Sequence, residues 1–274
     1  MYQFGWFSTG RGEGSKGLLK AAQDSIKGED LKAQIQFVFC SRERGETEAT
    51  DRYLNMVEDY HIPLVNLSYR RFKSGRTDTD DTGALAPWRL EYDREVIARL
   101  NGFTPDICVL AGYMLIVGPE MCRKYRMINL HPAAPGGPAG TWQEVIWKLI
   151  EDKADTTGVK MHLVIPELDE GPAAAYCTFP IRGKPFDQLW QEIEGQPVAK
   201  IKAEQGENNA LFKLIRKSGY IRELPLTVAT LKAFSGGQVK ITDDMRISDA
   251  SGRIIDGYDL SAEIDRQVKG LLPD

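Results

Sequence analysis

Two polar residues suited to acyl-type chemistry stand two positions apart in the segment MINLHP, residues 127–132. Side chains alternate along an extended strand, so Asn129 and His131 point to the same face, and Pro132 ends the ladder of backbone hydrogen bonds. Histidine exchanges protons near neutral pH, and an amide donates a hydrogen bond to the oxygen that becomes negative in a tetrahedral intermediate. The pair predicts a reactive site at the exit of a strand.

Such a site also needs a carboxylate that orients and charges the imidazole. Asp169, in ELDEGP (167–172), is the candidate because it follows another apolar stretch, although Asp before Glu-Gly-Pro is also good turn chemistry. The other two histidines are weaker candidates. We expect His61 in a surface turn or cap, and we expect His162 to bond a neighbouring backbone group within a strand.

A glycine-rich segment, GRGEGSKG (10–17), follows the first apolar stretch and predicts anion binding, because glycines let backbone N–H groups turn toward a phosphate. A tight turn without a ligand is the alternative. The segment also matches GxGxxG, and Arg42 after the second stretch would suit a 2′-phosphate, so an NADP-binding oxidoreductase stays open. The residues singled out are Gly12, Glu13, Gly14, Ser15 and Lys16; the Glu13 carboxylate must point away from a phosphate.

The elements that must position these residues alternate between strands and helices. Strands are predicted at 3–8, 34–40, 62–68, 106–114, 127–132 and 159–168, and helices at about 18–28, 47–60, 88–100 and 142–152. Residues 71–86 are expected to form a polar loop, and Arg89, Asp93 and Arg94 to lie on polar helix faces. This order predicts an α/β fold with a mainly parallel, doubly wound sheet and helices on both faces.

The chain changes character after about residue 184. A charged helical stretch (about 186–234) precedes short alternating segments, which predicts a catalytic domain over 1–184 and a C-terminal helical and strand extension over 185–274 packed on it.

Composition narrows the class of protein. The 274 residues are 42% hydrophobic, with a net charge of −4, which argues against nucleic acid as the main partner. The four cysteines form no CxxC pair, which predicts reduced, mostly buried thiols in a cytoplasmic protein. We find no signal peptide, no apolar run long enough to cross a membrane, and no His or Cys cluster with metal-ligand spacing, so neither a membrane nor a metal is expected.

At this point the ordered motifs, GEGS, PDICVLAGYM, INLHP, a strand histidine and ELDEGP, resemble the glycinamide ribonucleotide formyltransferase family, which is folate-dependent. The resemblance covers about residues 3–183. It implies a Rossmann-like formyltransferase fold, transfer of a formyl group from 10-formyltetrahydrofolate to the amine of glycinamide ribonucleotide in purine synthesis, and no metal. Small-molecule substrates are its expected partners, and a homodimer is compatible with it.

The resemblance also implies roles for individual residues. Asn129, His131 and Asp169 match the catalytic set, and Gly12 to Lys16 match the loop that holds the substrate phosphate. Tyr113 and Pro132 would flank the substrate channel. The residues implied in folate binding are Arg89, which would meet an anionic group of a ligand, together with Met114, Leu115, Ile116, Val117, Asn129, Glu167, Leu168, Glu170 and Gly171.

Several departures from the family pattern bear on the acceptor: Lys16-Gly17, Ala133 and Trp142. Leu115 departs too, at a folate-segment position that contributes mainly its backbone. The departures that bear on the acceptor leave open another amine acceptor, such as a sugar nucleotide, or hydrolysis of the formyl folate. A catalytically silent binding module is a further alternative, which the intact Asn129, His131 and Asp169 disfavour.

Overall fold

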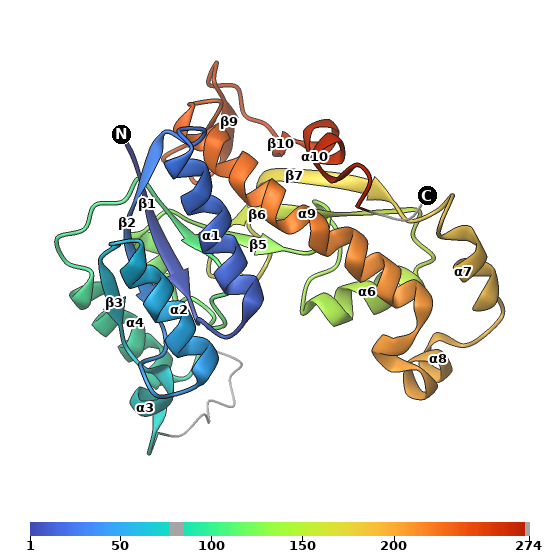
Figure 1. The fold of residues 1–274 in the computed structure, drawn as a ribbon, viewed down its shortest axis with the longest axis horizontal. Helices are drawn as coiled ribbons and strands as arrows, with labels where there is room; N and C mark the ends of the chain where they lie inside the picture. Colours follow the sequence, from blue (N-terminus) through green and yellow to red (C-terminus); the bar gives the residue numbers. More distant parts are fainter. Residues whose placement is uncertain (77–84, 272–274) are drawn as a thin grey trace. The chain divides into compact units, whose positions relative to one another are not determined.

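The computed structural model describes residues 1–76 and 85–271, and the chain divides into two compact units (Figure 1). Unit 1 comprises Met1–Asn129 and Leu163–Gly171, and unit 2 comprises Leu130–His162 and Pro172–Asp274. Each unit is therefore built from two separate stretches of chain.

Five parallel strands form the sheet of unit 1, in the order β3-β2-β1-β4-β5. The strand order reverses between β1 and β4, and in such sheets ligands bind at the carboxyl ends of the strands beside this reversal. The predicted fold class is confirmed. The strands are β1 Tyr2–Ser8, β2 Ala33–Cys40, β3 Leu64–Asn66, β4 Ile107–Leu110 and β5 Met127–His131.

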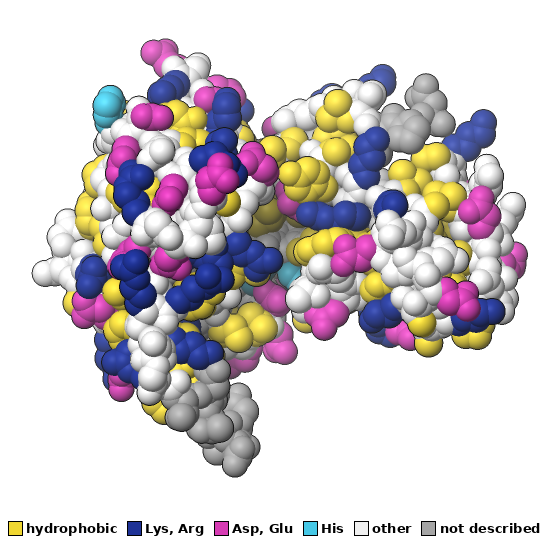
Figure 2. Space-filling view, turned by 60° about the horizontal axis from the view of Figure 1, so that its bottom comes forward, with side chains coloured by type: hydrophobic (Ala, Val, Ile, Leu, Met, Phe, Trp, Pro, Cys, Tyr) yellow, Lys and Arg dark blue, Asp and Glu magenta, His cyan; other side chains and the backbone are white. Residues whose placement is uncertain are grey.

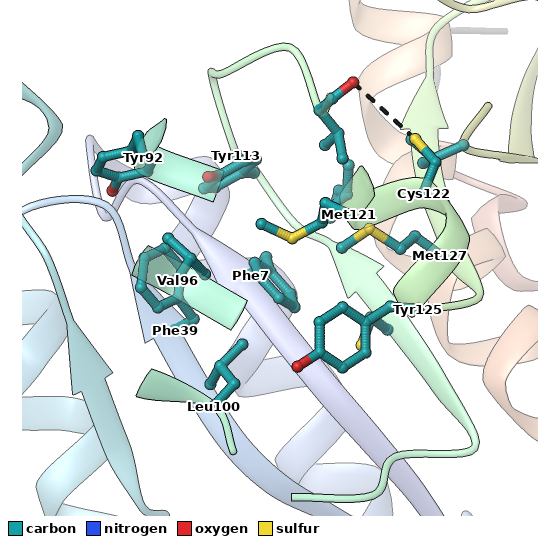
Figure 3. Close-up of a cluster of buried hydrophobic side chains, with 14 of the residues drawn as sticks. Phe7, Phe39, Tyr92, Val96, Leu100, Tyr113, Met121, Cys122, Tyr125 and Met127 are labelled. Atoms are coloured by element: carbon teal, nitrogen blue, oxygen red, sulfur yellow. Dashed lines mark hydrogen bonds between the residues drawn. The ribbon is translucent and has the colours of Figure 1, made fainter. Parts of the chain in front are cut away.

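Helices cover both faces of this sheet. Phe7 of β1 and Phe39 of β2 pack against Tyr92, Val96 and Leu100 on one face (Figure 3), as their alternation along the strands requires. The helices α1 and α2 lie over the opposite face (Figure 1). The helices of unit 1 are α1 Glu13–Lys27, α2 Glu48–Asp59, α3 Tyr69–Lys73, α4 Pro87–Arg99 and α5 Pro119–Lys124.

Three local predictions for unit 1 need correction. The expected loop at 71–86 begins inside a helix, because the Ser68 side chain accepts a hydrogen bond from the Arg71 N–H and caps α3. Residues 77–84 of this expected loop lie outside the described residues. Helix α5 was not predicted, since six residues are too few for a periodic pattern. The apolar run 106–114 is a strand only to Leu110.

Unit 2 holds an antiparallel pair, β6 and β7, and β10 runs parallel to β7. Strands β8 and β9 form a separate hairpin. The strands are β6 Thr156–Leu163, β7 Ala173–Pro180, β8 Val239–Ile241, β9 Ile247–Asp249 and β10 Tyr258–Asp259. The helices are α6 Trp142–Glu151, α7 Asp187–Glu192, α8 Val198–Glu204, the 3-10 helix Gly206–Asn208, α9 Ala210–Ser235 and α10 Ser261–Val268.

The helical stretch predicted for 186–234 is interrupted rather than continuous. Breaks fall at Gly195 and Gly206, both with positive φ, and a long helix follows them. Arg222 of this helix, α9, is buried and donates hydrogen bonds to the Ser218 carbonyl and, at 2.8 Å, to the Asp265 carboxylate of α10. This ion pair anchors α10 to α9.

The cysteine prediction is confirmed: Cys40, Cys108, Cys122 and Cys177 are free and buried. Among the described residues no helix is both long and apolar enough for a membrane crossing. Acidic and basic side chains are interspersed on the face drawn in Figure 2.

Candidate active site

The predicted phosphate segment follows β1 and becomes the first turn of α1. The helix begins at Glu13 rather than near Leu18, so Glu13, Gly14 and Ser15 are helical. Their backbone N–H groups precede the first helical hydrogen bond, which runs from the Lys16 N–H to the Gly12 carbonyl. No side chain caps this end, and a helix N-terminus of this kind attracts anions. The Glu13 side chain is exposed.

Close packing joins this turn to the segment after β4. Gly112 has φ +68°, and a Cβ built on it would lie 2.3 Å from the Ser15 Oγ. Only glycine fits there, both for its φ and for the contact. The Thr9 N–H donates to the Gly112 carbonyl at 3.0 Å, so the exits of β1 and β4 are tied to each other.

The predicted folate segment, Tyr113 to Val117, leaves this junction. Met114 and Ile116 expose 59% and 43% of their surface, which is unusual for large apolar side chains. Tyr113 points the other way: its ring is buried, edge-on to Phe7 at 5.8 Å, and its hydroxyl has no partner among the described residues. Burial raises the Tyr113 pKa.

Arg89 and Asp93 hold the far end of this segment in place. Arg89 Nη2 donates to Asp93 Oδ1 at 2.6 Å and to the Ile116 carbonyl at 2.7 Å. Asp93 Oδ2 accepts the Gly118 N–H at 2.7 Å. The expectation that Arg89 and Asp93 lie on polar helix faces is wrong: both are buried, because each neutralises the other, whereas Arg94 is exposed as expected.

Burial raises the pKa of the Asp93 carboxyl, and Arg89 and the Gly118 N–H partly oppose that shift. Two further guanidinium nitrogens of Arg89, Nε and Nη1, are buried without a partner in the described part of the chain.

The second predicted folate segment, Glu167 to Gly171, also belongs to unit 1. Leu168 is 54% exposed, and Asp169 adopts φ 60°, a left-handed conformation that Asp tolerates better than most residues. A Cβ built on Gly171 would lie 1.8 Å from the Leu163 carbonyl oxygen. Only glycine therefore lets the loop backbone pass so close to the end of β6.

Asn129 and His131 both lie in β5, two residues apart, and Asn129 pairs with Leu110 of β4. His131 belongs to unit 2, where its Nε2 lies 2.9 Å from the Pro138 carbonyl oxygen. A carbonyl accepts only, so Nε2 carries a proton in this contact. The His162 ring is buried and lies edge-on to the His131 ring, with 6.0 Å between the ring centroids. His61, by contrast, is exposed in the turn after α2 and has φ 57°.

Pro132, the other predicted channel residue, lines a small cavity of unit 2. Trp142 of α6 and Arg216 of α9 share it, and the Arg216 guanidinium lies between the Trp142 and Tyr220 rings, 4.7 and 4.8 Å from their centroids. The structure thus places His131 and Pro132 in unit 2, and Asn129, Asp169, Arg89 and the phosphate and folate segments in unit 1.

Sequence reasoning missed two polar residues at the strand exits. Thr9 Oγ1 accepts a hydrogen bond from the Met114 N–H and another from the Ser41 hydroxyl. Ser and Thr after a strand are common in any turn, so their spacing carried no signal. No group of three His, Cys, Asp or Glu side chains suited to a metal occurs in residues 1–76 and 85–271.

Comparison with known proteins adds independent findings. A family model described as formyl transferase matches residues 11–185. Phosphoribosylglycinamide formyltransferase of Saccharomyces cerevisiae is 30% identical over 172 residues, which are 60% of this chain and 75% of that protein. Formyltetrahydrofolate deformylase of Haemophilus influenzae is 28% identical over 44% of this chain and 38% of its own length. The chain spans about half the length of two other relatives that it matches.

The fold is also found in solved structures. Phosphoribosylglycinamide formyltransferase of Coxiella burnetii superposes with a TM-score of 0.63 at 16% identity, over 94% of this chain and 98% of that one.

Proposed function

Because the chain belongs to the formyl transferase family, we propose that it moves the formyl group of 10-formyltetrahydrofolate to the amine of glycinamide ribonucleotide. The observation that carries this proposal is the family match over residues 11–185, which contain every residue assigned a role from the sequence. In this proposal residues 1–184 carry the chemistry and residues 185–274 extend them.

The substrates of this reaction fit the two segments of unit 1. The N-terminal turn of α1 offers unpaired N–H groups to the 5′-phosphate of the acceptor. Met114, Ile116 and Leu168 offer exposed apolar surface to the flat pterin ring, since exposed apolar side chains of this size mark binding surfaces. Arg89 Nε and Nη1 would meet an anionic group of the folate.

The chemistry requires little beyond orientation and charge stabilisation. The acceptor nitrogen attacks the formyl carbon, and the carbonyl oxygen becomes an oxyanion. Asn129 donates a hydrogen bond to that oxygen, an effect worth about 3–4 kcal/mol at comparable sites. His131 stabilises the same intermediate as a cation, and Asp169 completes the catalytic set that the resemblance implies. The amine proton passes to the folate N10 through a water molecule, and the C–N10 bond breaks.

Two alternatives predict different products. A formyl-folate hydrolase would release formate without an amine, and a transferase for another amine would ignore glycinamide ribonucleotide. The NADP-binding alternative loses its support, because the family match assigns the GEGSKG segment to a formyl transferase.

An acceptor panel tests the proposal. Purified protein is given 10-formyltetrahydrofolate alone, with glycinamide ribonucleotide, or with amino-sugar nucleotides, and both tetrahydrofolate and formate are measured. We expect tetrahydrofolate only with glycinamide ribonucleotide and no formate. Formate release without an amine would replace the proposal by hydrolysis, and turnover with another amine alone would remove the acceptor.

A further inference from the structure

Arg42 is a buried cation without an ion-pair partner among the described residues. It follows β2, only 5% of its surface is exposed, and its Nε is buried with no hydrogen-bond partner among the described residues. No carboxylate of the described residues forms an ion pair with it. The Arg42 side chain shares a hydrogen bond with the Tyr69 hydroxyl, and Glu46, whose Oε2 is buried without a partner in the described part of the chain, acts electrostatically on the same Cys40 thiol as Arg42. Desolvating a guanidinium without an anion costs free energy, so such a residue indicates a missing anion.

Two arginines near Arg42, unlike it, form ion pairs with carboxylates. Arg44, two residues on, donates to Glu58 and Asn55, and Arg71 of α3 donates to Glu43, each at 2.6 Å. These side chains are exposed, whereas Arg42 is enclosed.

The residues just before Arg42 contact the start of the predicted phosphate segment, within unit 1. The preceding residue, Ser41, donates its hydroxyl to Thr9 at 3.0 Å and its N–H to the Ser8 carbonyl at 3.0 Å. Gly10 packs against the same exit: its built Cβ would lie 3.3 Å from the Cys40 Sγ, and its carbonyl accepts the Thr50 hydroxyl. The exit of β2 is therefore in direct contact with the start of the loop that leads to α1.

We propose that Arg42 supplies the counter-charge for the phosphate dianion of the acceptor, together with the N–H groups of Glu13 to Ser15; this rests on the proposed function. A helix N-terminus contributes only about half an elementary charge, whereas a phosphate monoester carries nearly two near neutral pH. An arginine adds a full charge and a forked pair of donors matched to phosphate oxygens. Arg42 would thus select acceptors that carry a terminal phosphate.

Ribose 5-phosphate is a suitable probe, because it carries the phosphate without the reacting amine. Its affinity is measured by calorimetry for the wild-type chain, Arg42→Gln and Arg42→Lys. We expect Arg42→Gln to bind at least about tenfold more weakly and Arg42→Lys to lose less, because it keeps the charge but not the fork. Arg44→Gln, which removes an exposed and already paired arginine, should bind as the wild type does.

Kinetics separate this inference from the proposed function. In Arg42→Gln the KM for glycinamide ribonucleotide should rise about tenfold or more, while the KM for 10-formyltetrahydrofolate stays unchanged. If the protein turns over no glycinamide ribonucleotide, the proposed function fails, yet the ribose 5-phosphate measurement still decides the role of Arg42. Equal affinity for the probe in folded Arg42→Gln and wild type would overturn the inference. Should Arg42→Gln fail to fold, Arg42→Met, which keeps the bulk of the stem without the charge, takes its place, and wild-type affinity for the probe in that folded variant would overturn the inference.

Discussion

The hydroxyl of Thr9 accepts the backbone N–H of Met114 at 2.9 Å, across 105 residues of sequence. The same oxygen accepts the Ser41 hydroxyl at 3.0 Å. One buried side chain therefore connects the exit of β1, which leads into the phosphate segment, with the start of the folate segment and with the exit of β2. Within unit 1 this hydroxyl sets the spacing of the two proposed substrate segments.

Replacing Thr9 by valine keeps the shape and removes the acceptor. The Met114 N–H and the Ser41 hydroxyl then lose their partner, which should lower the free energy of unfolding by about 1–3 kcal/mol. The KM for 10-formyltetrahydrofolate should rise more than kcat falls. Urea denaturation and steady-state kinetics check both, with Thr9→Ser as the control that keeps the hydroxyl. Wild-type stability and folate KM in Thr9→Val would refute this role.

Removing either partner of the buried pair Arg89–Asp93 should lower the free energy of unfolding strongly. Arg89→Met or Asp93→Asn leaves one buried charge unpaired, which should cost about 3–5 kcal/mol of unfolding free energy. The double variant should cost less than the sum of the two, because it leaves no unpaired charge. A double-mutant cycle by chemical denaturation measures this coupling.

The exposed pair Arg99–Glu95 is the matched comparison, since its partners also stand four residues apart within α4. The same cycle there should give a coupling of about 0.2–1 kcal/mol. Equal couplings at the two pairs would contradict the view that burial gives Arg89–Asp93 its importance.

Two glycines should respond to alanine in opposite ways. Gly171→Ala places a Cβ against the Leu163 carbonyl and should destabilise by about 1–3 kcal/mol. Gly219→Ala, inside α9, meets only Phe179 at 4.0 Å and should stabilise by about 0.4–1 kcal/mol. Thermal melting of both variants checks the two predictions. A Gly171→Ala variant more stable than the wild type would contradict the close contact between Gly171 and the Leu163 carbonyl.

The thiols give a dependence on pH with a defined sign. Burial raises the pKa of Cys122 to about 11 and those of Cys40 and Cys177 to about 12, above the usual value of 9.0. The folded state thus holds these protons longer than the unfolded state does. Their contribution to stability is fully present below pH 9 and is lost as the pH rises through 11 to 12.

Iodoacetamide labelling and urea titrations test this dependence. At pH 8 the folded chain should label Cys122 about 100-fold more slowly than the unfolded chain, and Cys40 and Cys177 more slowly still. The free energy of unfolding should fall between pH 9 and pH 11. Rapid labelling of Cys40 in the folded chain would contradict its burial.

The sequence predicted much of unit 1, because local patterns determine it. The apolar runs ending at Ser8, Cys40 and His131 are strands, and the alternation of elements implied the parallel sheet. The resemblance built on INLHP and ELDEGP is confirmed by the family match. The start of α1 was placed too late, since the glycines of GEGSKG have low helix propensity and tertiary packing of Ser15 under Gly112 outweighs it.

Other features depend on contacts between distant residues and left no local signal. The burial of Arg89 also requires the Ile116 carbonyl, 27 residues away, and the i,i+4 spacing of Arg89 and Asp93 fits an exposed helix pair equally well. The contact of His131 Nε2 with the Pro138 carbonyl depends on how the AAPGGPAG turn folds back. Arg42 showed its missing counter-charge only once its burial was known.

The most direct test of formyl transfer at this site compares kcat of His131→Ala and Asn129→Ala with the wild type, using 10-formyltetrahydrofolate and glycinamide ribonucleotide. Loss of either stabilising group should lower kcat by about 10²–10³, while melting temperatures show that both variants fold. Retention of kcat within a few-fold in both folded variants would contradict the assignment of the chemistry to β5.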